Sequence, residues 1–473
     1  MQFYPIAEYR PDIANMNGLY CDDIANVFPG QDSYRPMKSF SLIPGYKFPD
    51  EIISVCYARS RRHGGVLIAG SKTRLYVSKE SFGGSGYWRR WEDASGAQQK
   101  YNADLIKSPW SFTIFGTYVL AVNKNDVPQY LNLEASLLNF FPLPGNPPRA
   151  GVVKVWGDFL CLLQLPEFPN RIHWSGLNDI RCWTVGEKSC DYQDFPEGGC
   201  VQTANENVNP FIFMDNAIYG GTFLPGSDVV FSFKKLHFGR GCLSNSALSY
   251  NGEINFFVDS GGFFGMTNDG ALSPIGFEKV DRTYLSGDLA KKRFFSTFDY
   301  VHNRIYWEVF DISGTKLILD TILVYDFLLQ KWSVRETKEK HLVLSHPAFP
   351  VITVNGTASH IIAFDEENRF GSYAGENLPA RISSADIITH GRTGYKLRAV
   401  RAIIDTHDYS VDIGFRNKED KKDIYWLKGR RPSFRSGNIM QVSNGRYYRL
   451  KLHTDPGAAW QNMNGFFAEF SKK

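Results

Sequence analysis

The chain has 473 residues, of which 15% are aromatic, with 42 glycines and a formal net charge of +4 at pH 7. This length exceeds one ordinary hydrophobic core, so it requires either several domains or a repeat architecture. The high aromatic and glycine content, and the lack of long runs with helical spacing, exclude a mainly helical protein and favour strands joined by turns.

The sequence also limits the compartment in which we expect the protein and the metal or redox chemistry that it can perform. Its start, MQFYPIAEYRPDIANM, lacks the apolar core of a signal peptide, and no run approaches the ~18 apolar residues of a membrane span. The seven cysteines include no C-x-x-C pair, and the spacing of Cys182, Cys190 and Cys200 suits no common metal template. We therefore expect a soluble protein with reduced thiols and without a metal, a cofactor or membrane insertion.

Residues 1–49 contain six prolines and no sustained periodicity. Because proline lacks a backbone donor and disfavours helix in the preceding residue, this segment is predicted to be an extended N-terminal arm. The arm either packs on the flank of the following domain, where it can donate a closing strand, or reaches a neighbouring subunit.

Residues 50–391 repeat one pattern, in which an apolar strand meets a short turn of Gly, Asn, Asp or His and returns as a second apolar strand. A closed ring of such units removes the exposed strand edges that a long all-β chain otherwise has. The pattern predicts a β-propeller of six or seven blades. The turns lie at residues 62–65, 115–117, 156–158, 214–216, 250–252, 301–303 and 354–356.

The clearest unit is the segment 294–336, FFSTFDYVHNRIYWEVFDISGTKLILDTILVYDFLLQKWSVRE. Its residues alternate with the period of two expected of pleated strands, and its turns separate four strands. The outer half of this unit, 322–334, matches 171–185, and 74–91 is a version with a longer loop. We expect four tryptophans of these units to be buried between blades: Trp174, Trp183, Trp307 and Trp332.

Residues 392–473 alternate without the turn-plus-Trp unit, which predicts a separate small C-terminal β-sandwich. This module is basic. Residues 391–473 hold 17 Lys+Arg against 8 Asp+Glu, a net of +9, whereas residues 1–390 hold 36 against 41, a net of −5. The near-neutral chain therefore divides into two oppositely charged parts.

Enzyme motifs are weak, and no catalytic residue is assigned. Asp259-Ser260-Gly261 resembles the nucleophile segment of chymotrypsin-like proteases, but a triad also needs a base and an orienting acid, so we interpret it as a turn in the fifth blade. A carbohydrate-binding or glycan-cleaving propeller is the alternative function, although the Asp-box turns of sialidases are missing. A basic loop with Arg59, Arg61 and Arg62 is a candidate anion contact.

With these features together, the chain resembles the tail hub or nozzle proteins of short-tailed bacteriophages, also called packaged-DNA stabilisation proteins. The resemblance rests on overall size, on the proline-rich entry with Val27-Phe28-Pro29-Gly30 and Tyr34-Arg35-Pro36, and on two later segments, Leu272 to Arg282 and Leu323-Val324-Tyr325-Asp326.

The resemblance implies a structural virion protein in the phage tail, synthesised in the host cytoplasm and without catalytic residues. Such proteins form a homo-oligomer, a hexameric ring, below the portal and adaptor proteins. The ring closes and lines the DNA exit channel until DNA ejection and supports the tail needle, fibre or spike proteins.

The charge division predicts how these tasks are shared. A duct must not grip double-stranded DNA, and an acidic lining meets that need because each Lys or Arg that neutralises a phosphate adds affinity. The basic module suits docking on an acidic neighbour, where complementary charge orients association. The candidate docking residues are Lys418, Lys421, Lys422, Arg430 and Arg431.

Overall fold

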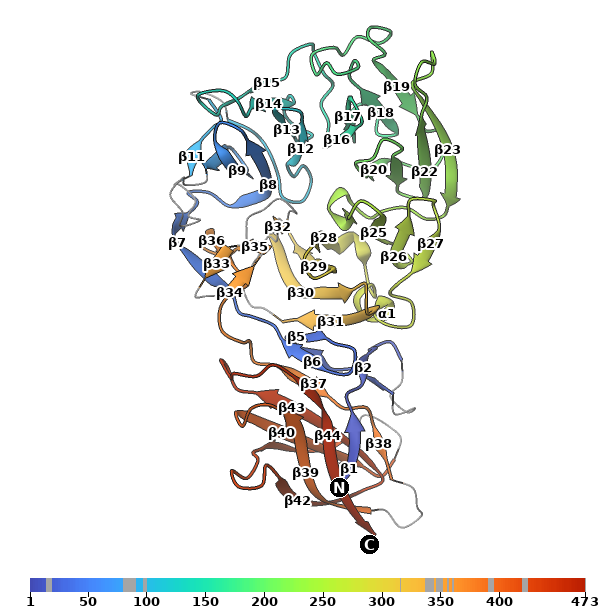
Figure 1. Cartoon of the computed structure of the whole chain (residues 1–473). Coiled ribbons are helices and arrows are strands. Elements are labelled where there is room, and N and C mark those ends of the chain that lie inside the picture. Colours follow the sequence, from blue (N-terminus) through green and yellow to red (C-terminus); the bar gives the residue numbers. More distant parts are fainter. Residues whose placement is uncertain are drawn as a thin grey trace.

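A computed structural model describes residues 1–13, 19–79, 91–96, 100–314, 316–336, 344–345, 352–354, 357–359, 361–389, 395–418 and 424–472. The chain forms a ring of four-stranded antiparallel sheets and, below it, a sandwich of two sheets (Figure 1). Helix is confined to α1 (Asp281–Tyr284) and the 3₁₀ turns η2 (Asn245–Ala247) and η3 (Leu289–Lys291) among the described residues. None of the described helices could cross a membrane.

The ring has seven blades, which agrees with the predicted six or seven. Blades one to three comprise β8 (Ile52–Ser60), β9 (Gly64–Ser71), β10 (Leu75–Lys79) and β11 (Glu92–Asp93); β12 (Ser111–Phe115), β13 (Tyr118–Val122), β14 (Gln129–Asn132) and β15 (Phe140–Pro142); and β16 (Val152–Trp156), β17 (Phe159–Leu163), β18 (Arg171–Trp174) and β19 (Asp191–Asp194).

Blades four to six follow in chain order. They comprise β20 (Val201–Ala204), β21 (Phe211–Met214), β22 (Ala217–Phe223) and β23 (Phe231–Phe238); β24 (Leu248–Tyr250), β25 (Ile254–Asp259), β26 (Gly262–Thr267) and β27 (Leu272–Pro274); and β28 (Lys292–Asp299), β29 (Arg304–Ser313), β30 (Lys316–Asp326) and β31 (Lys331–Arg335). The first strands of several neighbouring blades contact one another: β8 with β12, β12 with β16, β24 with β28 and β28 with β32 (Leu344–Ser345).

The seventh blade closes the ring with a strand from the N-terminal segment. Its sheet runs in the order β32 (Leu344–Ser345), β35 (Ile361–Phe364), β36 (Arg369–Ser372) and β7 (Ser41–Lys47). The outermost strand, β7, precedes blade one in the sequence and pairs antiparallel with β36. The segment before the first blade is thus hydrogen-bonded to the last, which ties the two ends of the ring together.

Blade six has the four strands predicted from its sequence. Its tryptophans form the centre of a core: Trp307 and Trp332 are fully buried and stack with ring centroids 5.4 Å apart. The ring of Phe263, from blade five, lies 5.0 Å from each of them. Trp174 and Trp183 are buried as well, so all four tryptophans lie in the interior as predicted.

Two details of the repeat differ from the sequence interpretation. The Trp183 segment was matched to the outer strand of blade six, but it lies in a turn, where the Trp183 indole donates to the carbonyl of Ile180 at 2.8 Å. This segment belongs to blade three, whose fourth strand is β19, further along the chain. The turn at 354–356 joins β33 (Ile352–Val354) to β34 (Thr357–Ser359), a separate hairpin inserted in blade seven, and residues 355–356 lie outside the described residues.

The sandwich combines both ends of the chain. One sheet contains β1 (Gln2–Pro5), β5 (Val27–Pro29), β6 (Tyr34–Pro36), β39 (Tyr395–Ile404), β42 (Ile439–Gly445) and β44 (Met463–Lys472). The other contains β4 (Ile24–Ala25), β37 (Arg381–Ser383), β38 (Ile387–Ile388), β40 (Tyr409–Arg416), β41 (Tyr425–Arg430) and β43 (Tyr447–Thr454). A short parallel pair, β2 (Glu8–Tyr9) and β3 (Tyr20–Cys21), lies beside them.

The segment predicted as an extended arm is therefore divided between the two domains, and it donates the closing strand that one of the two predicted alternatives included. Its first part completes the sandwich and its last part completes the propeller. Likewise the sandwich begins before residue 392, since β37 and β38 belong to it. One hydrophobic core runs from blades five and six, with Trp307, into the sandwich, with Leu450 and Phe466.

Candidate functional site

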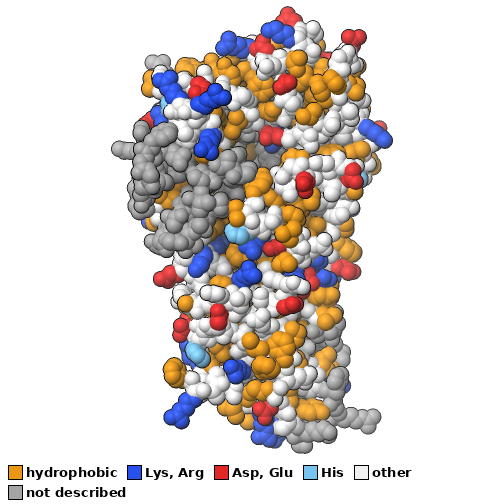
Figure 2. Space-filling view, viewed as in Figure 1, with side chains coloured by type: hydrophobic (Ala, Val, Ile, Leu, Met, Phe, Trp, Pro, Cys, Tyr) orange, Lys and Arg blue, Asp and Glu red, His pale blue; other side chains and the backbone are white. Residues whose placement is uncertain are grey.

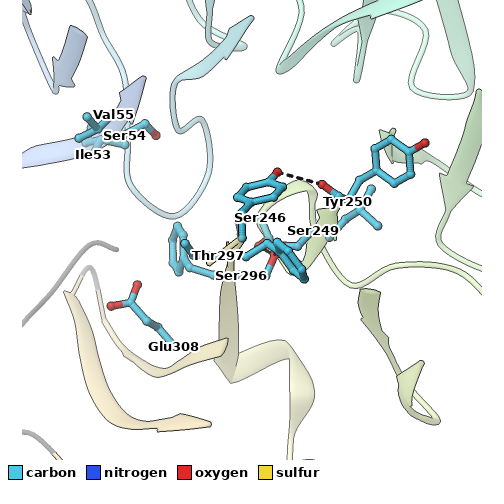
Figure 3. Close-up of a pocket in the computed structure, with 13 residues that line it drawn as sticks. Ile53, Ser54, Val55, Ser246, Ser249, Tyr250, Ser296, Thr297 and Glu308 are labelled. Carbon is cyan, nitrogen blue, oxygen red and sulfur yellow. Dashed lines mark hydrogen bonds between the residues drawn. The ribbon is translucent and has the colours of Figure 1, made fainter. Parts of the chain in front are cut away.

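A pocket of about 300 Å³ lies at the ring axis of the propeller (Figure 3). Its walls come from the first strands of three blades, β8 on one side and β24 and β28 on the other. Hydroxyl groups and aromatic rings line it, together with the carboxyl group of Glu308 on β29. A space of this size admits a small molecule and is far too narrow for a DNA duplex.

Most of the lining hydroxyls already bond to the wall. Ser246 donates to the carbonyl of Phe294 at 2.7 Å, and Ser296 donates to the carbonyl of Ser246 at 3.0 Å. The Ser249 hydroxyl donates to Ser296 at 3.0 Å, and Tyr300 donates to the carbonyl of Tyr250 at 3.2 Å. These bonds join blades five and six, so the hydroxyls hold the wall together and have fewer donors left for a ligand.

A second carboxyl group reaches the axis from the loop between β20 and β21. Glu206 accepts a hydrogen bond at 2.6 Å from Thr113 of blade two. Burial raises the pKa of the Cys56 thiol on β8 to about 12, and the Glu206 charge contributes to the same shift. A thiol with so high a pKa stays protonated at neutral pH and is a poor nucleophile.

The pocket offers weak support for glycan cleavage. Such enzymes use two carboxyl groups that flank the scissile bond, and Glu308 is the one carboxyl side chain among the lining residues that the structure describes. Glu206 is bonded to Thr113 and is not part of the lining. The aromatic rings and hydroxyls are compatible with binding a sugar.

The protease-like segment forms a turn in blade five, as the sequence indicated. Asp259 and Gly262 pair at the end of the β25–β26 hairpin, and Ser260 is exposed between them. The Asp259 carboxylate accepts the Gly261 N–H at 2.6 Å and forms a salt bridge with Arg240 at 3.1 Å. Its bonds are those of a turn residue, with no histidine base among these partners.

The cysteines form no disulfide. Cys190 lies 3.6 Å from Nε2 of His173, the distance of a weak thiol–imidazole hydrogen bond. Burial raises the pKa of Cys190 to about 12, and burial lowers that of His173, so both groups are neutral at pH 7. Within the described residues, no group of three His, Cys, Asp or Glu side chains is arranged to hold a metal ion.

The candidate anion loop lies at the β8–β9 hairpin, with Arg59, Arg61 and Arg62 all exposed. The loop rests on blade two. The Arg61 N–H donates to the Glu134 carboxylate at 3.1 Å, and the Arg62 guanidinium donates to the Glu134 carbonyl at 3.4 Å. This loop therefore has a demonstrated role in joining two blades.

Three of the five docking candidates lie in the described part of the chain, and they are not all close together. Lys421 and Lys422 lie outside the described residues, and Lys418 is exposed just beyond β40. Arg430 pairs with Val411 at the opposite end of the β40–β41 ladder, about 23 Å from Lys418 at ~3.3 Å per strand residue. Arg431 forms two hydrogen bonds with Asp455, at 2.9 and 3.0 Å.

The junction of the two domains was not recognised from the sequence. Asn26, buried and with φ of 60°, donates its backbone N–H to Val334 of blade six at 2.8 Å. Its side chain donates to the carbonyl of Pro379 at 2.9 Å and accepts the N–H of Glu336 at 2.9 Å. Asparagine tolerates the left-handed backbone conformation better than most residues, so one side chain can join three segments here.

An ionic network reinforces the same junction. Asp23 accepts hydrogen bonds from Arg381 at 2.6 Å and from Lys451, and Arg381 also pairs with Glu336 at the end of blade six. Burial opposes ionisation of Asp23, but the bonds to Lys451 and Arg381 outweigh it and leave the pKa of Asp23 below its usual value. The carboxylate is thus charged at neutral pH.

A second network lies inside the sandwich. Asp386 is fully buried and accepts hydrogen bonds from Arg416 at 2.6 Å and from Arg449 at 2.9 Å. Arg449 also contacts Asp22 of the N-terminal segment at 3.2 Å. These charges are paired because an isolated buried charge is costly.

No protein-family model matches the chain, and no curated protein matches it significantly. Among solved structures, the β-propeller domain of Myceliophteria thermophila Cps50 (Swd1) is similar over 70% of this chain and 98% of that chain, with a TM-score of 0.44 and 8% identity. YCF48 bound to D1 peptide is similar over 75% of this chain and 98% of that chain, with a TM-score of 0.40 and 11% identity. These similarities carry no functional argument.

Proposed function

We propose that the chain is a structural protein of a bacteriophage tail, a subunit of the hub or nozzle ring that closes and lines the DNA exit channel. In this role it links the portal and adaptor proteins to the needle, fibre or spike proteins. The proposal starts from the sequence resemblance. The observation that supports it best is the junction, where the N-terminal segment is paired into both domains.

This junction suits a subunit that holds its position under load. The chain passes from sandwich to propeller through Asn26, whose hydrogen bonds reach blade six and the segment before β37. The core is continuous across the boundary, and Arg381 links Asp23 to Glu336. Large hydrophobic interfaces of this kind oppose relative motion of domains.

Double-stranded DNA would pass between the subunits of the ring and not through a propeller, because the pocket at each propeller axis is too small. The net charge of −5 over residues 1–390 favours a lining that repels phosphates. We therefore expect the assembled ring to bind duplex DNA weakly at physiological salt.

Negative-stain imaging of the purified protein tests the proposal directly. The expected result is rings with a central hole, and a mass in solution that is a multiple of the 53.7 kDa chain. A protein that stays monomeric at all concentrations and does not enter virions would contradict it. Tight binding of duplex DNA by intact rings would contradict the non-adhesive lining.

The alternative function is a carbohydrate-binding propeller, which the aromatic rings and hydroxyls around the axial pocket favour. It predicts that glycans bind to the monomer and that substitution of Tyr250 or Phe295 abolishes binding. Ring formation without glycan binding would separate the two functions.

A further inference from the structure

The outer edges of the sheets differ in how they are protected against pairing with strands of other molecules. An exposed edge strand offers unpaired backbone groups to any other strand, and proteins usually prevent such pairing with charged residues or proline. The outermost strands of the blades and one edge of the sandwich follow this rule. They carry Glu92 on β11, Pro142 on β15, Asp191 on β19, Lys234 on β23, Pro274 on β27, Lys331 on β31, Lys47 on β7 and Lys428 on β41.

Strand β42 differs from these strands. It forms one edge of the sandwich sheet that contains β39 and pairs on one side with β39, and no other described strand pairs with it. Its seven residues, IMQVSNG, contain neither a charge nor a proline. Met440 and Val442 point outward and are 73% and 57% exposed, whereas Ile439 is buried.

The surroundings of β42 are apolar and basic. Phe434, in the loop that leads into the strand, is 90% exposed. Arg398 and Arg401 on the neighbouring β39 are exposed, as is Arg435 in the loop, and none of the three forms a salt bridge with a described carboxylate. Figure 2 shows hydrophobic and basic side chains together over the lower end of the molecule, where the sandwich lies.

We propose that β42 is a docking edge for an extended, acidic segment of a different protein, which adds to the sheet as its next strand. Backbone hydrogen bonds along the open edge would supply affinity, and alternate side chains of the segment would supply specificity. Apolar side chains would cover Met440 and Val442. Acidic side chains would face Arg398, Arg401 and Arg435.

The positive charge around β42 disfavours a second copy of this chain as the occupant. Pairing two β42 edges would bring two sets of the same arginines together, and like charges across an interface are unfavourable. An acidic strand instead neutralises them.

This inference rests on the proposed structural function and deepens it, because it names the surface through which the sandwich would hold a neighbouring tail protein. It adds one continuous edge to the docking candidates predicted from the sequence.

Two synthetic peptides test the edge without knowledge of the partner. Each is a blocked peptide of about seven residues, long enough to cover the strand. Its outward-facing positions alternate Val with Glu in one peptide and Val with Lys in the other, with Thr at the positions between. The Glu peptide is expected to bind at low salt, to weaken as salt rises, and to slow backbone hydrogen exchange in residues 439–445. The Lys peptide is expected not to bind.

Variants locate the contact. Met440→Glu with Val442→Glu adds negative charges at exposed positions and should weaken Glu-peptide binding by about tenfold or more, with the thermal midpoint unchanged. Leu236→Glu, on the already charged β23, is the matched control and should bind as the wild type does. Arg398→Ala with Arg401→Ala should weaken binding and reduce its salt dependence.

The proposal is overturned if the Glu peptide binds the Met440→Glu, Val442→Glu variant as tightly as the wild type, or if protection appears elsewhere than residues 439–445. It is also overturned if Met440→Glu with Val442→Glu abolishes ring formation, since β42 would then join copies of this chain. Negative-stain imaging distinguishes the two proposals. Rings that form but do not bind the peptide contradict only the docking edge, and peptide binding without rings contradicts only the ring function.

Discussion

The propeller and the sandwich reach stability by different routes. Each blade of the propeller is almost wholly a continuous stretch of chain, and blade six fills its core with the stacked Trp307 and Trp332. The sandwich joins residues from opposite ends of the chain, such as Gln2 with Ala468, and buries the Asp386 network in its interior. Local strands with apolar cores can be recognised from sequence, whereas distant strands held by buried charges cannot.

The largest expected effect lies in the sandwich. Asp386→Ala leaves the guanidinium groups of Arg416 and Arg449 buried without their shared carboxylate, which should cost stability at the upper end of about 3–5 kcal/mol. Denaturant unfolding measures this. Asp455→Ala is the control, because it breaks the exposed pair with Arg431 and should cost ~1 kcal/mol or less. Similar losses in both variants would mean that burial of the network does not matter.

In the propeller, Trp307→Ala should cost about 3–5 kcal/mol, since it removes a fully buried side chain between blades five and six. Phe434→Ala removes an aromatic ring that is 90% exposed and should change stability by about 0.5 kcal/mol or less. Because the core is continuous, Trp307→Ala and Asp386→Ala should each shift one common unfolding transition. Two separate transitions would show that the domains unfold independently.

A third effect depends on pH. Burial raises the pKa of Asp281 to about 7, partly opposed by the Phe263 N–H and aided by the carboxylates of Asp12 and Asp259. The folded protein keeps this proton up to about pH 7 and the unfolded chain loses it near pH ~4, so Asp281 lowers stability as pH rises through that window.

Asp281→Asn should therefore stabilise the protein at pH 8 and leave it nearly unchanged at pH 4, as judged by the denaturant midpoint at each pH. Asp228→Asn, at an exposed position, is the control and should show no such difference. Equal stabilisation by Asp281→Asn at both pH values would refute the raised pKa.

The sequence predicted the propeller well because each blade's signal is local. In blade six, strands β28 to β31 follow one another through short turns, and their period of two is visible over five or more residues each. The same approach failed at Trp183, where a Trp-Thr-Val segment resembles the outer strand of blade six but forms a turn. Composition alone does not separate these two conformations.

The N-terminal segment could not be predicted for a physical reason. Strands β2 to β6 have two or three residues each, too few for a period of two to be visible. The partners of β4 and β6 in β37 and β44 lie hundreds of residues away. Buried charges were missed as well, because Arg416 and Asp386 belong to residue types that are ordinarily on the surface. The axial pocket, too, depends on strands from three blades, which only the closed ring brings together.

The pairing of β1 with β44 sets a condition on how the protein is made. Residues 2–5 leave the ribosome long before residues 465–468, their partners. Blades two to six can fold while translation continues, but the sandwich has to wait with its earliest strand unpaired. A chain that stops short of β44 therefore lacks the strand between β1 and β39 and leaves β1 without its partner.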